Sequence, residues 1–265
     1  MSRVYLSSPM LGNEVRKILT QPEIGLSLID IPACSSLAAP VSTHPDMLFY
    51  RLRSGGLLTD SSYYAENPEF FSGLEGLTDI ITSEARVSEK YPGDIRFDVL
   101  DIDGTVYGRM DFAAPEITAE CKKAVNVRQG YARCAVLKLE PATGFECSDC
   151  SCACGTVPDG LKNRRDGRDF AAVTADKQLY NALTADGIDT LLISHGGIML
   201  PGYDCGFIGG ASVCIEEKRT VVFFGDISRH ADYDDIRNFI SRWGYDIKYP
   251  SDVPLFDSGS LVRVR

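Results

Sequence analysis

The sequence predicts an α/β fold in which five similar units form a closed, five-bladed α/β propeller. Five amphipathic helical segments begin at nearly constant intervals along the 265 residues. A short apolar strand follows each helix, and a β-hairpin then leads to the next helix. Three strands therefore separate successive helices, whereas a doubly wound sheet alternates single strands with helices. The competing interpretation is another α/β arrangement, such as an open sheet, in which the regular spacing is accidental.

The helical segments carry recognisable start and stop signals. Pro115 suits the first turn of a helix. Asp176 is an N-cap residue, and the segment that it begins ends at Gly187. The last helix has the clearest apolar face and runs from Asp232 to Gly244. The five starts, which lie 49, 53, 61 and 56 residues apart, are Asn13, Ser62, Pro115, Asp176 and Asp232.

Each helix is followed by strands of similar length and order. The short strands after the helices are predicted at Leu26–Ile31, Leu77–Ile81, Val125–Val127, Thr190–Ile193 and Tyr245–Tyr249. The hairpins are predicted at Met47–Leu58, Ile95–Arg109, Cys134–Val173 and Phe207–Phe224, with a last one beginning at Ser260–Val264. That last hairpin lacks a second strand in the C-terminal sequence. Val4–Leu6 can supply it and close the ring.

Composition excludes several classes of protein. Hydrophobic residues make up 44% and charged residues 24% of the chain, which is typical of a globular protein. The net charge of −10 disfavours nucleic-acid binding, which depends on basic surfaces. No apolar run is long enough to span a membrane, and the N-terminal residues lack the apolar core of a secretory signal. We therefore expect a single domain over residues 1–265, located in the cytoplasm, with no linker inside it and an oligomeric state left open.

Two of the three histidines follow predicted strands at equivalent places in the repeat. His44 and His195 lie 151 residues apart, in segments expected to converge near the axis of a propeller, where pockets form. A histidine titrates near neutral pH and can act as an acid, a base or a metal ligand. A single histidine is more typical of a structural position, but the shared placement favours a functional role for His195. Two glycines follow His195 and leave room for a ligand.

Four of the nine cysteines crowd into one short segment. Cys147, Cys150, Cys152 and Cys154 lie in a predicted insertion at about 140–169, within the third hairpin. Four thiolates can hold zinc, but structural sites usually draw two ligand pairs from separate strands or knuckles. The alternatives are a zinc site peripheral to the main pocket and a reduced or oxidisable loop tip without metal. No cofactor is expected in the main pocket.

Five blocks of sequence together carry a family resemblance. They are HPDMLFY (44–50), GYARC (130–134), VTADK (173–177), the glycine-rich block 194–212 and PLFDSGS (254–260). In these blocks the chain resembles the guanidino-group-modifying enzyme superfamily, the pentein fold of arginine deiminases, dimethylarginine dimethylaminohydrolases and amidinotransferases. It is most similar to an uncharacterised bacterial branch of that fold.

The resemblance implies a set of site residues, but this sequence lacks one of them, the cysteine nucleophile. Enzymes of the superfamily use a cysteine near the C-terminus to attack the guanidinium carbon, a histidine as general acid/base, and carboxylates that bind the guanidinium. His195 matches the histidine, and Asp46 lies in the region that supplies a carboxylate. The segment 256–260, where the nucleophile is expected, contains no cysteine. Ser260 paired with His195, or Cys205, would have to replace it.

Two hypotheses about function follow. In the first, the chain is an enzyme acting on a small polar or guanidinium-bearing molecule, with His195 as acid/base and His44 and Asp46 lining the pocket. Asp204 or Asp257 would then contact a cation. In the second, the chain is a catalytically lapsed member that binds a small ligand or serves as an interaction module through the same pocket. The missing cysteine favours the second hypothesis for amidine hydrolysis, and the identity of the substrate stays open.

Overall fold

In the computed structural model, which describes residues 3–140 and 170–265, the strands form five three-stranded sheets. The sheets share one pattern, because the middle strand pairs antiparallel with one neighbour and parallel with the other. The first sheet joins β15 (Val262–Arg263), β1 (Arg3–Ser7) and β2 (Leu26–Asp30). The second and third contain β3 (Phe49–Arg51), β4 (Leu57–Asp60) and β5 (Ile80–Ser83), then β6 (Leu100–Ile102), β7 (Thr105–Gly108) and β8 (Lys123–Asn126). The last two contain β9 (Val136–Leu139), β10 (Ala171–Thr174) and β11 (Asp189–Leu192), then β12 (Ser212–Ile215), β13 (Thr220–Phe223) and β14 (Asp246–Lys248).

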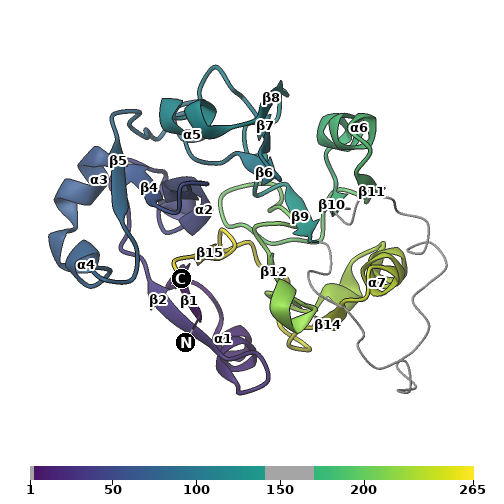
Figure 1. The fold of residues 1–265 in the computed structure, drawn as a ribbon. Helices are drawn as coiled ribbons and strands as arrows, with labels where there is room; N and C mark the ends of the chain where they lie inside the picture. Colours follow the sequence, from purple (N-terminus) through teal and green to yellow (C-terminus); the bar gives the residue numbers. More distant parts are fainter. Residues whose placement is uncertain (1–2, 141–169) are drawn as a thin grey trace, which may run out of the picture.

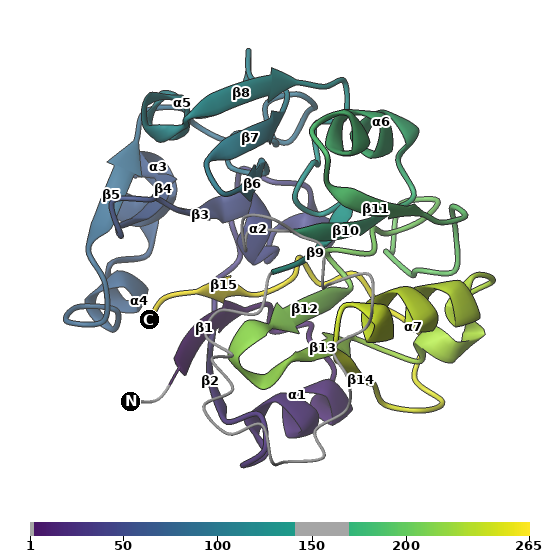
Figure 2. The same ribbon diagram turned by 45° about the vertical axis from the view of Figure 1, so that its right-hand side comes forward.

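A helical connection joins the two parallel strands of each sheet, as parallel pairs require. In Figure 2 the strands β3, β6, β9, β12 and β15 lie toward the middle of the molecule together with the short helix α2, and the other helices lie further out. The helices are α1 (Asn13–Thr20), α2 (Pro45–Leu48), α3 (Ser61–Glu66), α4 (Pro68–Ser72), α5 (Pro115–Glu120), α6 (Lys177–Ala185) and α7 (Tyr233–Arg242), with short 3₁₀ turns at Ala39–Val41, Glu216–Lys218 and Ile227–Arg229.

Two helices begin at an aspartate that caps them. The side chain of Asp60 accepts hydrogen bonds from the backbone N–H groups of Ser62 and Tyr63 at the start of α3. Asp176 does the same for Gln178 and Leu179 at the start of α6. Such caps satisfy amide groups that have no partner inside the helix. The N-cap predicted at Asp176 is therefore confirmed.

The strand order confirms the pairing predicted between the two ends of the sequence. Strand β1 pairs antiparallel with β15, with Tyr5 opposite Arg263 and Leu6 opposite Val262. Figure 1 shows the two marked ends of the chain close to this sheet. The helix expected from Ser62 is interrupted at Pro68, which begins a second short helix. Some predicted strands are displaced: the one expected at Leu77–Ile81 lies at Ile80–Ser83, and the one expected at Val125–Val127 lies at Lys123–Asn126.

Apolar side chains pack between the sheets and their helices. On α7, for example, Ile236 and Ile240 are fully buried in the same cluster as Phe223 of β13. Within the described residues, no helix is long and apolar enough to cross a membrane. Apart from residue 140, the predicted cysteine-rich insertion at about 140–169 lies outside the described residues, and so do its four cysteines.

Candidate functional site

A cavity of about 260 Å³ brings together four of the residues singled out in the sequence. His44, His195, Asp204 and Asp257 all line it, although they come from segments far apart in the chain. We call it the histidine cavity. Its wall is completed by aromatic and sulfur-containing side chains and a few aliphatic ones: Tyr131, Tyr203, Phe207, Cys134, Cys205, Met47, Val41 and Leu200.

Asp257 is fixed at the base of this cavity by backbone groups. Its carboxylate accepts hydrogen bonds from the N–H of Phe207 (2.8 Å) and of Gly259 (3.0 Å). A Cβ at Gly210 would lie 2.1 Å from a carboxylate oxygen of Asp257, so only glycine allows this approach. Burial raises the pKa of Asp257 to about 7, and the charge of Asp46 adds to the shift. Near neutral pH this carboxyl group is therefore poised between its two protonation states.

His44 lies next to Asp257 and is almost completely buried. Its Nδ1 is 3.9 Å from Asp257 Oδ1, too far for a direct hydrogen bond. A Cβ at Gly259 would lie 2.5 Å from the Cβ of His44, so the turn that carries Gly259 packs directly on this ring. Burial lowers the pKa of His44 to about 4, and the imidazole is neutral at physiological pH.

Asp46 does not line the cavity but lies behind it. The thiol of Cys134 donates to Asp46 Oδ2 at a distance of 3.0 Å. Asp98 accepts hydrogen bonds from the N–H groups of Arg133 (2.8 Å) and Cys134 (3.1 Å). Asp46 and Asp98 are fully buried, and one oxygen of each has no hydrogen-bond partner among the described residues. We call Asp46, Asp98 and Cys134 the buried acidic cluster.

Burial sets the protonation of this cluster. It raises the pKa of Asp46 to about 7, with a further contribution from the charge of Asp98, and it raises the pKa of Asp98 to about 6. The pKa of the Cys134 thiol is well above its usual value for the same reason, and the nearby carboxylates add to the shift. Cys134 is therefore a neutral thiol that donates a hydrogen bond, rather than a thiolate.

His195 stands between the histidine cavity and a neighbouring cavity of about 290 Å³. It lines both, together with Phe207. The side chain is exposed, and Gly196 and Gly197, which follow it, have φ values of 116° and 74° that favour glycine. Cys205 is half-buried and donates its thiol hydrogen to the carbonyl of Gly206.

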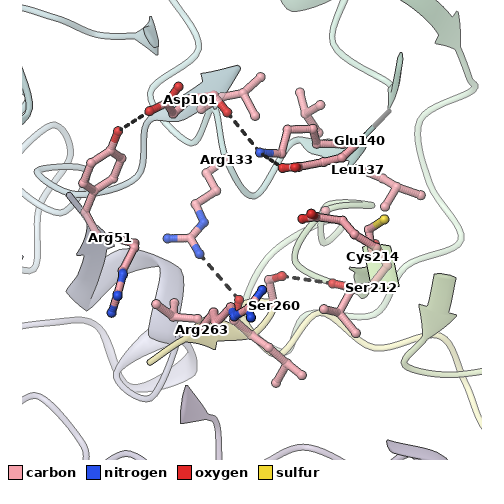
Figure 3. Close-up of a pocket in the computed structure, with 18 of the residues that line it drawn as sticks. Arg51, Asp101, Arg133, Leu137, Glu140, Ser212, Cys214, Ser260 and Arg263 are labelled. Carbon is pink, nitrogen blue, oxygen red and sulfur yellow. Dashed lines mark hydrogen bonds and ion pairs between the residues drawn. The ribbon is translucent and has the colours of Figure 1, made fainter. Parts of the chain in front are cut away.

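Ser260 is not brought to His195. Gly259 and Ser260 both have positive φ values, 77° and 54°, and the Ser260 hydroxyl donates to the carbonyl of Ser212 at 3.0 Å. Ser260 lines a different cavity of about 480 Å³, which we call the wide cavity, and His195 does not (Figure 3). The turn at Gly259 thus separates Ser260 from the histidine cavity that Asp257 lines.

Sequence reasoning did not single out Asp98 or Cys134. Each stands just before a strand and is followed by apolar residues. A polar residue directly before a buried strand is the sequence pattern that could have pointed to them. Within the described residues, no group of three or more His, Cys, Asp or Glu side chains could hold a metal ion. The predicted zinc site falls on cysteines outside those residues and stays a prediction.

Comparison with known proteins places the chain in a family. One family model, described as a family of unknown function (DUF6873), matches residues 10–143 and 168–262. The chain belongs to this family. No curated protein matches the sequence. Among solved structures, the chain is similar to SxtG, an amidinotransferase of the saxitoxin biosynthetic pathway from Microseira wollei. The TM-score is 0.51 at 10% identity, over 96% of this chain and 78% of that one. This member of the family therefore has an amidinotransferase-like fold.

Proposed function

We propose that the histidine cavity binds a small molecule with a guanidinium group. The observation that carries the proposal is the convergence of Asp204 and Asp257 with two imidazoles and several aromatic rings on one cavity. Carboxylates match the planar array of guanidinium N–H donors, and aromatic faces attract cations. The amidinotransferase-like fold and the resemblance in the five sequence blocks support the same ligand class.

Asp257 is the group suited to hold the cation. Two backbone N–H groups already stabilise its charged form, and a bound guanidinium would lower its pKa from about 7. Tyr131 and Phe207 pack against each other with ring centroids 5.8 Å apart, and both line the cavity. A planar cation between carboxylate and aromatic faces fits this arrangement.

A second candidate function is catalysis at the same site, with His195 as general acid/base. The thiol that the superfamily uses as nucleophile is missing from the C-terminal segment, and the neutral Cys134 is a weak nucleophile. Cys205 lines the histidine cavity together with His195 and is the more accessible thiol. This observation favours Cys205 over Ser260 as the residue to test for covalent chemistry.

Titration calorimetry with agmatine, arginine and methylguanidine tests the binding proposal. We expect saturable binding of at least one of them, weakened by about tenfold or more in Asp257→Asn, because the charged acceptor is lost. Asp235→Asn, which removes an exposed carboxylate on α7, is the matched control and should bind as the wild type does. Absence of binding by all three guanidines, or equal binding by Asp257→Asn, would overturn the proposal.

Turnover separates the two candidates. Release of ammonia or formation of a ureido product from a bound guanidine, lost in His195→Ala and in Cys205→Ala, would establish catalysis. If the wild type binds a guanidine without turnover, the binding function stands and the catalytic candidate is rejected.

We also propose that the five sheets form the closed five-bladed propeller expected from the repeat. The wide cavity supports this arrangement, because side chains of β1, β3, β6, β9, β12 and β15, and so of all five sheets, line it. An experimental structure tests the proposal. Five sheets placed in sequence order around one central channel are expected, and an open row of sheets would contradict it.

A further inference from the structure

Part of the wide cavity is lined by arginines, and the guanidinium site proposed in the histidine cavity gives them no role. The volume of the wide cavity is about 480 Å³, and strands of all five sheets contribute to its wall. Arg51, Arg133 and Arg263 lie around one part of it, from β3, from the segment before β9 and from β15 (Figure 3). This clustering of arginines occurs in a chain whose net charge is −10.

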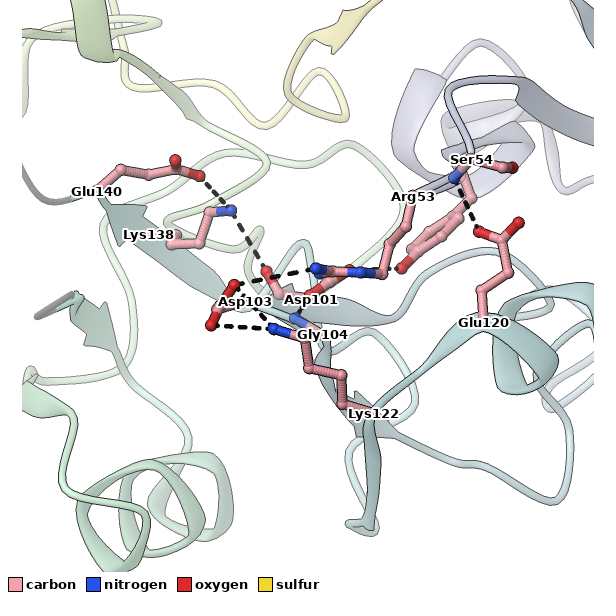
Figure 4. Close-up of polar contacts among 10 residues, drawn as sticks. Arg53, Ser54, Asp101, Asp103, Gly104, Glu120, Lys122, Lys138 and Glu140 are labelled. Atoms are coloured by element: carbon pink, nitrogen blue, oxygen red, sulfur yellow. Dashed lines mark hydrogen bonds and ion pairs between the residues drawn. The ribbon is translucent and has the colours of Figure 1, made fainter. Parts of the chain in front are cut away.

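Three carboxylates that line the wide cavity, Asp101, Asp103 and Glu140, form ion pairs with other cations (Figure 4). Glu216 also lines the cavity, and burial together with the charge of Glu140 raises its pKa to about 7. Asp103 contacts Lys122 at 3.3 Å and Arg53 at 3.9 Å, and Asp101 lies 3.7 Å from Arg53. Glu140 is paired with Lys138 at 2.5 Å. These three carboxylates are therefore engaged away from the three arginines.

Two of the arginines donate mainly to neutral acceptors. Arg51 Nη1 donates to the carbonyl of Val264 (2.6 Å) and to the hydroxyl of Thr78 (3.0 Å). Arg133 donates to the carbonyls of Phe49 (3.0 Å) and Leu261 (3.5 Å). A guanidinium group has five N–H donors, so each retains donors for a ligand.

The carboxylates near these arginines do not balance their charge. Arg263 pairs with Glu217 at 2.8 Å, but Glu217 also pairs with Arg3 at 3.3 Å, so one carboxylate serves two guanidinium groups. Arg133 acts electrostatically on Asp46 and Asp98, yet burial raises the pKa of both carboxyls. Burial lowers the pKa of Arg51, and the positive charge of Arg263 adds to this shift.

We propose that the wide cavity binds a small oxyanion, a phosphate or carboxylate group, between Arg51, Arg133 and Arg263. An oxyanion would relieve the repulsion between Arg51 and Arg263 and accept hydrogen bonds from the remaining N–H donors of the three arginines, in the bidentate geometry that arginine favours. His195 and Asp257 take no part, so this site is separate from the proposed guanidinium site.

Titration calorimetry at low ionic strength tests the site, with inorganic phosphate in one arm and citrate in the other. Sodium chloride at matched ionic strength is the reference for general salt effects. We expect saturable binding of one equivalent in at least one arm, and the arm with the higher affinity identifies the oxyanion class. Arg51→Gln should weaken binding by about tenfold, because a charged hydrogen-bond donor is lost.

Matched variants make the result decisive. Arg237→Gln removes an exposed arginine on α7 that pairs with Asp234 and lies over the Tyr233 ring, and it should leave the oxyanion affinity unchanged. Arg263→Gln gives the same test at a second exposed position, should Arg51→Gln fail to fold. Asp257→Asn should retain oxyanion binding, which separates this outcome from that of the guanidinium experiments. Binding no stronger than that of chloride, or equal weakening by Arg237→Gln and by the cavity variants, would overturn the proposal.

Discussion

Arg133 and Cys134 are neighbours in the sequence, yet they line different cavities. Arg133 lines the wide cavity, where charged side chains reach water and form ion pairs with one another. Cys134 lines the histidine cavity and contacts carboxyl groups that water does not reach. Two consecutive residues thus lie in different environments, Arg133 among charged side chains and Cys134 among buried carboxyl groups.

The comparison shows that hydrogen bonding and burial shift the pKa of a carboxyl group in opposite directions at the two places. Beside the wide cavity, hydrogen bonds from Ser54 lower the pKa of Glu120. In the buried acidic cluster, the same functional group in Asp46 has a pKa raised to about 7. Changes on the closed side should therefore cost stability, and changes on the open side should cost little.

The largest effect is expected for Gly209→Ala, between the two regions. A Cβ there would lie 2.4 Å from the carbonyl oxygen of Val136 and 2.6 Å from that of Cys134, and backbone atoms cannot move aside easily. We expect a loss of about 3 kcal/mol in the free energy of unfolding. Urea denaturation measures it. Gly12→Ala, where nothing lies within 4 Å of the added Cβ, should change stability by less than about 0.5 kcal/mol.

Asp98→Ala should have the next largest effect. It removes the acceptor of the half-buried N–H of Arg133 and of the buried N–H of Cys134. A loss of about 2 kcal/mol is expected by urea denaturation. Asp98→Asn keeps one acceptor oxygen and should lose less. Equal stability of the alanine variant and the wild type would show that these two bonds contribute nothing net.

The closed side should also make stability depend on pH. Asp46 and Asp257 keep their protons up to about pH 7 in the folded chain, whereas unfolded aspartates lose them near pH 4. The folded state then binds more protons between these values, so these groups make the free energy of unfolding fall as pH rises from about 4 to about 7. His44, with its pKa lowered to about 4, contributes the opposite slope below about pH 6.5.

Asp257→Asn isolates one part of this dependence. Relative to the wild type, the variant should gain stability between pH 5 and pH 7.5, because asparagine has no proton to lose. Unfolding by urea at both pH values gives the difference. The matched Asp235→Asn variant should follow the wild type in parallel, and a parallel curve for Asp257→Asn would contradict the raised pKa.

The smallest effect is expected on the open side, for Lys122→Gln. Lys122 is more than half exposed, and its contact with Asp103 at 3.3 Å is screened by water. Surface pairs of this kind contribute roughly 0–1 kcal/mol, so we expect a change below about 0.5 kcal/mol in unfolding experiments. A loss as large as that of Asp98→Ala would remove the distinction between the two sides.

The repeat made most of the fold predictable. Local signals such as the Asp176 cap and the spacing of the helices survive in a single sequence, and they also located the pairing of β1 with β15. The position of β5 was less predictable, because Ile80 and Ile81 are preceded by an apolar Leu77 that belongs to a turn rather than to the strand.

The candidate site was predictable only in part. His44 and His195 line one cavity, as their equivalent places in the repeat predicted, and a repeat can be read from sequence. Asp204 and Asp257 line the same cavity. Asp98 acts through backbone N–H groups 35 and 36 residues away, and no local pattern encodes that contact. The direction of the turn at Gly259 likewise depends on packing against His44, which placed Ser260 in the wide cavity.

The reactivity of the buried Cys134 thiol can be used to measure how often the structure around it opens locally. A maleimide or a disulfide reagent reacts with thiolates, so it can reach Cys134 only when the surrounding structure separates and lets the thiol ionise. The rate of its labelling, followed by peptide mass spectrometry against that of the half-buried Cys205, then reports the equilibrium of local opening. A ligand bound in the histidine cavity would slow the labelling of Cys134, and a ligand bound elsewhere would leave the labelling rate unchanged.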